Sequence, residues 1–158
     1  MKETLISCSE KNESDKILQL LREGEDINQF EYGRSAIHST ILTNAVAAGS
    51  VLISRGINLN LQDKPSGATA LHYCAVYNRF EIANLILKAG GRLDIADNHG
   101  NQPLWTAVFN VKGKSERLPL IRLFLENGAD KNHKNFAGRS PYDFAKQIRD
   151  SNLIFLLS

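Results

Sequence analysis

The sequence is poor in the residues and patterns that mark several large classes of protein. Its 158 residues include two cysteines, Cys8 and Cys74, which form no spaced metal-binding or redox motif. No apolar run approaches the roughly 18 residues that span a membrane. The first residues also lack the basic-then-apolar pattern of a secretory signal. We therefore expect a cytoplasmic protein with reduced, buried thiols and no membrane partner.

Charge of one sign is not in large excess either. The 19 basic and 17 acidic side chains leave a net charge of +2, which does not indicate a nucleic-acid partner. The charges are unevenly spread, because residues 1–31 hold eight acidic and four basic side chains, whereas residues 111–158 hold nine basic and five acidic ones. In an elongated molecule this asymmetry forms a dipole that would orient a partner. The alternative is that both groups are solvated end faces.

What the sequence does contain is two series of regularly spaced glycines, with a period of about 33 residues, which is typical of a repeat protein. The first series is Gly33, Gly67, Gly100 and Gly138. The second series is Gly24, Gly56, Gly90 and Gly128, and in both series the last step is the longest. In a repeat protein each unit buries its apolar face against its neighbours. The second series suits positions just after a helix end, where a left-handed backbone is needed.

The best-formed unit identifies the kind of repeat. Residues 69–74 read T-A-L-H-Y-C, which resembles the ankyrin signature T-P-L-H-x-A, with Ala70 and Cys74 as departures. A weaker copy lies at residues 35–38, and residues 128–130 match the G-A-D of the ankyrin family. The resemblance covers nearly the whole chain.

This resemblance implies an all-α ankyrin-repeat solenoid. Each of about five repeats would combine a hairpin or turn with two antiparallel helices, and the terminal repeats would act as caps. We expect one domain over residues 1–158, with approximate repeats at 1–30, 31–63, 64–97, 98–135 and 136–158.

Two repeats depart from the regular pattern. The first has no hairpin of its own, and we expect its helices at residues 4–11 and 14–22, with Ser14 as the N-cap of the second. In the fourth, the longer step between glycines predicts a loop inserted near residues 111–118, followed by a helix over 120–127.

No set of side chains provides the roles that catalysis needs. His38 and His72 occupy the same signature position, and the resemblance implies that they make hydrogen bonds tying neighbouring hairpins together. His99 and His133 stand one repeat apart, roughly 10 Å, which is too far to share a zinc ion at about 2.1 Å per bond. A glycine-rich phosphate loop and a nucleophile motif are also missing from the sequence. We expect no enzymatic activity, no cofactor and no metal.

The resemblance indicates a protein-binding surface. In ankyrin proteins the hairpin tips and the first helices line a concave face that holds a partner protein. The concave ends of the first helices are predicted at residues 42–43, 76–77, 109–110 and 147–148. Together with the tips, the predicted partner-binding residues are Phe30, Tyr32, Arg34, Tyr77, His99, Asn101, Trp105, Phe109, Asn110, Phe136 and Arg139. Aromatic residues and Arg dominate binding energy at interfaces, although Trp105 and Phe109 have an alternative place in the core.

The partner is suggested by repeat four. Residues 100–110, the short insert and the helix up to Asp130 resemble small, free-standing bacterial ankyrin proteins, some of which are immunity proteins for secreted toxins. The resemblance implies an inhibitor that covers the active site of a toxin and has no chemistry of its own. A general adaptor, a host-directed effector and a regulatory subunit of an enzyme stay open as alternatives. We expect a monomer or a weak oligomer.

Overall fold

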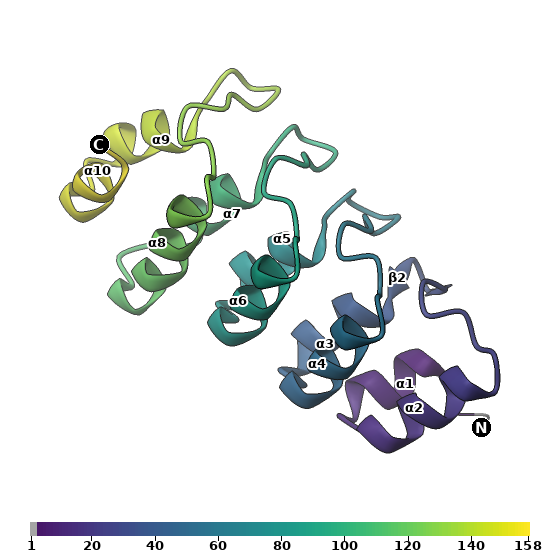
Figure 1. The fold of residues 1–158 in the computed structure, drawn as a ribbon. Helices are drawn as coiled ribbons and strands as arrows, with labels where there is room; N and C mark the ends of the chain where they lie inside the picture. Colours follow the sequence, from purple (N-terminus) through teal and green to yellow (C-terminus); the bar gives the residue numbers. More distant parts are fainter. Residues whose placement is uncertain (1–2) are drawn as a thin grey trace.

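The protein forms an elongated stack of helix pairs with hairpin-like tips projecting from one side (Figure 1). The structure is a computed structural model that describes residues 3–158. Its elements are, in order, α1 (Leu5–Glu10), α2 (Ser14–Arg22), β1 (Phe30–Glu31), β2 (Arg34–Ser35), α3 (Ala36–Thr43), α4 (Val46–Ser54), α5 (Ala70–Tyr77), α6 (Phe80–Lys88), α7 (Pro103–Phe109), η1 (Ser115–Arg117), α8 (Leu118–Glu126), α9 (Pro141–Ile148) and α10 (Ser151–Leu157). The predicted all-α ankyrin-repeat solenoid is confirmed.

The helices fall into two layers. We call α3, α5, α7 and α9, which directly follow the tips, the inner helices, and α4, α6 and α8 the outer helices. The two helices of each repeat pack on each other, and within each layer successive helices pack on one another from α3 to α9 and from α4 to α8. The core is therefore continuous along the stack, with fully buried side chains such as Ile37, Leu71, Leu104 and Leu153 in successive repeats. Neighbouring repeats supply the burial that one repeat lacks.

The first repeat begins as the sequence predicts but is capped differently. The hydroxyl of Thr4 accepts the backbone N–H of Ser7, and the hydroxyl of Ser7 accepts that of Thr4, which closes a capping box on α1. The predicted N-cap of α2 was wrong. Ser14 is its first helical residue, and the N-cap is Glu13, whose side chain makes no capping bond.

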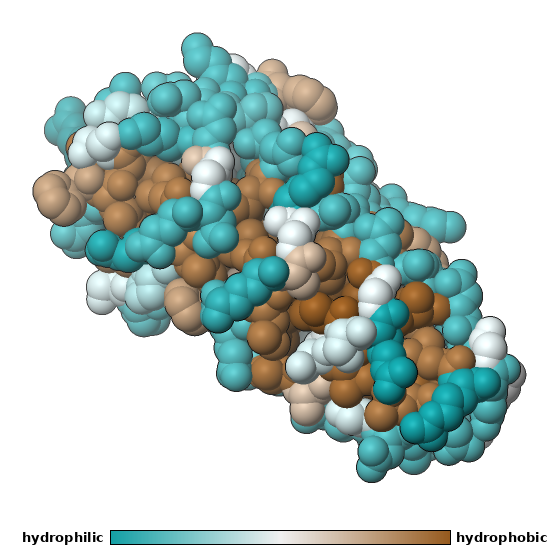
Figure 2. Space-filling view, viewed as in Figure 1, coloured by the Kyte–Doolittle hydropathy of each residue, from teal (hydrophilic) through white to brown (hydrophobic). Residues whose placement is uncertain are grey.

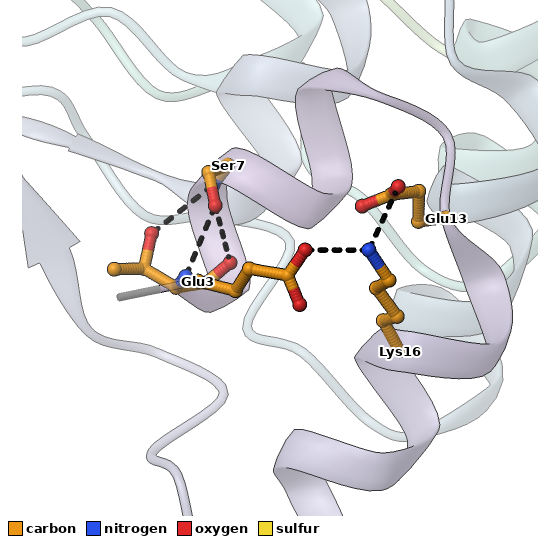
Figure 3. A network of polar contacts seen from close by, with 5 residues as sticks. Glu3, Ser7, Glu13 and Lys16 are labelled. Atoms are coloured by element: carbon orange, nitrogen blue, oxygen red, sulfur yellow. Dashed lines mark hydrogen bonds and ion pairs between the residues drawn. The ribbon is translucent and has the colours of Figure 1, made fainter. Parts of the chain in front are cut away.

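An ion-pair network holds the two helices of this first repeat together (Figure 3). The ammonium group of Lys16, on α2, lies between the carboxylates of Glu3 and Glu13. Hydrogen bonds to these two carboxylates raise the pKa of Lys16 and lower that of Glu3. Because all three side chains are largely solvated, the network orients the N-terminal end more than it stabilises the fold.

The insert of repeat four forms a turn and a short 3₁₀ helix. Residues 111–114 form a turn, η1 follows, and α8 begins at Leu118. The predicted helix start at residue 120 was wrong by two residues, because Pro119 lies inside the first turn of α8. Proline is tolerated there, since its missing N–H has no partner in the first turn of a helix.

Arginines at the start of α6 and α8 couple repeats three and four to the repeats before them. The guanidinium group of Arg79, just before α6, donates to the carbonyl oxygen of Ile41 at 3.0 Å. Arg117, just before α8, donates to the carbonyl oxygens of Ala75 and Val76 at 3.2 and 3.1 Å. These carbonyls lie in the last turns of α3 and α5, where no later residue of the helix supplies an i+4 N–H. The carbonyl of Ile41 also accepts the N–H of Asn44 at 3.3 Å. A cation there also interacts favourably with the helix dipole.

Two buried histidines tie the tips to the inner helices, as the resemblance implies. Nδ1 of His72 accepts the backbone N–H of Thr69 at 3.0 Å, and Nε2 faces the carbonyl oxygen of Asn101 at 2.8 Å. A carbonyl only accepts, so the proton is on Nε2 and the ring is neutral. His38 makes the same contacts with Ser35 and Ala68. Burial lowers the pKa of both histidines.

These lowered pKa values predict that acid weakens the fold. The unfolded state binds protons near pH 6.5 while the native histidines resist them, so the free energy of unfolding should fall as the pH drops below about 6.5. It should level off once the pH passes the lower native pKa values, apart from carboxylate effects below about pH 5. Urea unfolding across this range measures the change.

The control for this prediction is the double variant His38→Gln and His72→Gln, which should be less stable at neutral pH but lose less stability between about pH 7 and pH 5. Equal pH dependence in the wild type and the double variant would contradict the role of the two imidazoles.

Candidate functional site

The four tips form a continuous edge along the stack. We define them as residues 30–35, 63–69, 97–102 and 135–140. The first is closed by the pairing of β1 with β2, and the others by bonds from Asp63, Asp97 and Asn135 back across the turn. Neighbouring tips are joined by backbone hydrogen bonds of 2.9, 2.9 and 3.1 Å, donated by Lys64, Asn98 and Phe136 to the carbonyls of Gly33, Ser66 and His99. The tips are therefore held in a fixed register.

A side-chain acceptor shapes each of the last three tips from within. The carboxylate of Asp63 accepts the N–H groups of Ser66 and Ala68 and the hydroxyl of Tyr73, the last at 2.7 Å. Burial alone would raise the pKa of Asp63, but the bonds from Tyr73 and Ser66 hold it below its usual value. Burial and the same carboxylate raise the pKa of Tyr73. Asp63 is therefore a structural anion rather than a catalytic one.

Tyr32 projects from the first tip with 95% of its surface exposed. Its backbone φ is 49°, in the left-handed region, and Gly33 follows at 81°. A bulky residue is uncommon there, and a two-residue hairpin of this kind normally takes Asn-Gly. The exposed ring makes no packing contribution that would offset the unfavourable backbone.

Phe136 is the second prominent aromatic residue of the tips, with 81% of its surface exposed. One face of its ring lies against Gly100 on the preceding tip, where an added Cβ would come within 2.6 Å of the ring and 2.8 Å of the Phe136 nitrogen. Gly100 also has a φ of 77°. The glycine thus provides the space that fixes the orientation of this ring.

The inner helices add a row of exposed apolar side chains. Val76 and Phe109 each lie seven residues after the N-cap of their helices, and Tyr77 and Ile148 each lie eight residues after theirs. All four are more than one-third exposed. Because the repeats stack in register, these equivalent positions form the inner row, which runs parallel to the tips.

Trp105 is only partly available. Its ring lies 5.4 Å from that of Phe144 in the next repeat, and the ring of Phe109 lies 5.5 Å from Phe144 on another side. The rings of His38 in repeat two and Tyr73 in repeat three hold the equivalent positions, and their centres lie 4.9 Å apart. Trp105 is half-buried, whereas Phe109 keeps 46% of its surface exposed. Both therefore combine packing between repeats with exposure to solvent.

The other predicted binding residues also lie on the tips or the inner helix ends. Phe30 is half-buried, with the ammonium group of Lys64 5.6 Å from its ring centre. The amide oxygen of Asn101 accepts the amide of Asn135 on the next tip, and the amide of Asn110 donates to the carbonyl oxygen of Thr106. The remaining positions are the half-buried Arg34 and the exposed His99 and Arg139. The structure thus brings the predicted residues to one side, while their role in binding stays a prediction.

A second apolar feature was missed by the sequence reasoning. A groove of about 330 Å³ lies between α6 and α8, and its apolar lining includes Phe80, Leu118 and Leu123. Phe80 is 45% exposed. Figure 2 shows hydrophobic residues along the helical body, with the hairpin edge mostly hydrophilic. Phe80 is an aromatic residue that precedes a buried position of its outer helix by about one turn, and this pattern in the sequence could have indicated the groove.

Chemically reactive groups are not gathered on these surfaces. Burial raises the pKa of the Cys74 and Cys8 thiols, which disfavours the nucleophilic thiolate. Within residues 3–158, no group of three or more His, Cys, Asp or Glu side chains could hold a metal ion. Among the same residues, no helix is long and apolar enough to cross a membrane.

The chain is similar to several longer proteins, some of which are named for their ankyrin repeats. It is 29% identical over 145 residues to the nuclear factor NF-kappa-B p105 subunit of Gallus gallus, covering 87% of this chain and 14% of that protein. It is 28% identical over 140 residues to ankyrin repeat and SOCS box protein 6 of Mus musculus, covering 85% and 32%. It is 25% identical over 156 residues to putative ankyrin repeat protein FPV031 of Fowlpox virus, covering 97% and 46%.

The chain thus spans less than half the length of each of these relatives. A family model described as ankyrin repeats in three copies matches residues 5–97. That match covers more than half of the sequence and agrees with the helix pairs, tips and buried histidines described above. The protein belongs to the ankyrin repeat family.

Proposed function

We propose that this protein binds one partner protein along the tips and the inner row, and that it inhibits the partner by covering its active site. The observation that carries the proposal is the alignment of exposed apolar side chains, one or two per repeat, beside a fixed edge of tips. Tyr77, Phe109 and Ile148 represent the row, and Tyr32 and Phe136 the tips. Exposed aromatic anchors of this kind supply most of the energy of an interface.

The fixed register of the tips supports tight binding. Loops that order on binding lose conformational entropy, which weakens the complex. Here each tip is closed by a turn, joined to its neighbour through the backbone, and three of the four also carry an internal acceptor. A surface that is already organised loses less freedom on binding, so a rigid inhibitor is a suitable role.

The partner we propose is a toxin, with this protein as its immunity protein. The support is the resemblance of repeat four to small bacterial ankyrin proteins. Occlusion needs only a rigid surface of matching shape, so it requires no reactive group in the inhibitor. An adaptor is the second candidate, because the p105 and SOCS-box relatives carry their ankyrin regions within longer chains.

An affinity pull-down from the native source tests the proposal. The tagged protein is the bait, and captured proteins are identified by mass spectrometry. We expect one dominant partner bound with about nanomolar affinity or tighter, whose toxicity this protein neutralises at equal molar amounts. Several partners with about micromolar affinity would instead indicate an adaptor, and a captured enzyme that is activated would indicate a regulatory subunit.

The inner row should carry binding energy that the outer groove does not. Phe109→Ala should weaken binding to the captured partner by about 2–4 kcal/mol, measured by isothermal titration calorimetry. Phe80→Ala is a matched control, since Phe80 and Phe109 are 45% and 46% exposed. It should change binding by less than about 0.5 kcal/mol. The reverse order of effects would move the site to the groove between α6 and α8.

Tyr32 should show opposite effects on folding and on binding. Tyr32→Asn should stabilise the free protein by about 1 kcal/mol, because asparagine tolerates the left-handed backbone. The same change should weaken partner binding by about 2 kcal/mol. Tyr32→Phe is the control that keeps the ring, and it should alter neither quantity strongly. If Tyr32→Asn binds as well as the wild type, Tyr32 is not an anchor.

A further inference from the structure

The repeats allow the chain to be compared with itself, and the ends of the inner helices show a departure. In four repeats one residue with positive φ directly precedes the N-cap of the second helix. These residues are Asn12, Asn44, Asn78 and Arg149, with φ of 60°, 58°, 53° and 55°. Asparagine adopts this conformation readily, whereas arginine does so at a cost in energy. The last repeat therefore has a cation where the others have a neutral residue better suited to the backbone.

The tips show a second departure in the same direction. Asp63, Asp97 and Asn135 hold equivalent places, and the side-chain oxygen of each accepts backbone N–H groups of its own tip. Asn135 makes these bonds without a negative charge. Arg139 on the same tip and Lys134 directly before the tip are both exposed. The last tip is therefore cationic, whereas the two tips before it each contain a carboxylate.

A third departure lies between these two. Lys112, which follows α7, also has a positive φ, of 46°, and its ammonium group lies 5.4 Å from the centre of the Phe109 ring. A cation is thus placed beside an exposed aromatic residue of the inner row. Arg149 and Asn135 thus differ from the residues at equivalent positions of other repeats, and Lys112 lies in the insert, and all three make the surface of the last two repeats more positive.

The carboxylates of this region are committed to the backbone. Asp143 accepts the N–H of Ser140 and is paired with Lys146 at 3.4 Å. Asp150 accepts the N–H of Leu153 at the start of α10. No ion pair to Lys134, Arg139 or Arg149 is found within residues 3–158. Their charges are therefore open to a partner.

We propose that Lys112, Lys134, Arg139 and Arg149, which we call the basic end, hold an acidic segment of the partner protein, with Phe109 and Phe136 contacting apolar side chains within that segment. This inference rests on the proposed function and adds the chemistry of the partner. Cations that surround exposed aromatic rings match a protein segment in which acidic and apolar residues alternate.

A protein segment fits this surface better than a nucleic acid does. The exposed apolar side chain of Ile148 lies next to Arg149 and offers nothing to a phosphate. The exposed carboxylate of Glu116 lies near Lys112 and Lys114 in the same insert and would repel a phosphate backbone. Continuous positive charge, the usual mark of a nucleic-acid surface, is interrupted here.

The test uses a phage-displayed library of random peptides selected on the wild-type protein. The variant Asn135→Asp with Arg149→Asn restores at both places the residue that the chain uses in its other repeats. Asn101, whose amide oxygen accepts the amide of Asn135 at 2.8 Å, can rotate to donate instead. We expect the variant to unfold at the same temperature as the wild type or higher, so lost binding will not reflect lost folding. Arg122→Gln on α8 is the matched control for removal of an exposed positive charge.

Selected peptides should be rich in Asp and Glu and should contain apolar residues. Measured by fluorescence anisotropy, their affinity for the double variant should be lower by about tenfold at an ionic strength near 0.1 M. The difference should largely vanish near 1 M, where the Debye length is about 3 Å. Arg122→Gln should bind like the wild type.

Any of three results would overturn the inference. The selected peptides could lack an excess of acidic residues, or no selected peptide could lose binding to the double variant. A single-stranded oligonucleotide could also bind the wild type and not the double variant, while peptide binding is unaffected. Failure of this inference can be distinguished from failure of the proposed function. If Phe109→Ala loses binding of the native partner and the double variant keeps it, the proposed function stands and only the acidic segment is rejected.

Discussion

The hydrogen bond from a buried imidazole to a backbone carbonyl of the next tip connects successive repeats of this protein. His38 reaches Ala68 and His72 reaches Asn101, so each bond crosses from one repeat to the next. The same imidazole closes the N-terminal turn of its own helix, so one neutral ring fixes both a helix start and the position of the following tip. Without these bonds, the tips at residues 63–69 and 97–102 would lose their hydrogen bond to the preceding inner helix.

The last pair of repeats is joined differently, because Trp105 stands where the histidine would be. The ring of Trp105 packs on Phe144 instead, and His133 from the last hairpin faces the carbonyl oxygen of Gly100 at 3.1 Å. The amide of Asn135 adds a bond to Asn101. The imidazole-to-carbonyl bond of the earlier repeats is thus replaced by the contact between two aromatic rings and by hydrogen bonds near the last tip. This exchange leaves aromatic surface exposed in the repeats that are also most basic.

The sequence predicts the repeat architecture well because its signals are local. Glycine spacing, the signature at residues 69–74 and the two histidines each follow from the conformation of a few neighbouring residues. The N-cap of α2 and the start of α8 could not be fixed this way, since Ser14 and Pro119 are acceptable both before a helix and in its first turn. The shared role of Trp105 depends on Phe144, which belongs to the next repeat, so no local pattern indicates it. The close approach of Phe136 to Gly100 likewise becomes visible only when two tips are stacked.

Backbone strain and charge point to the same surface. Six non-glycine residues among those described have positive φ, and the three that are not asparagine are Tyr32, Lys112 and Arg149. Asparagine at these places would give a more stable backbone, and the chain uses it at all the others. The three exceptions are all exposed and lie on the tips or at the ends of the inner helices. Folding alone gives no reason for them, whereas a binding surface that trades some stability for contact accounts for all three.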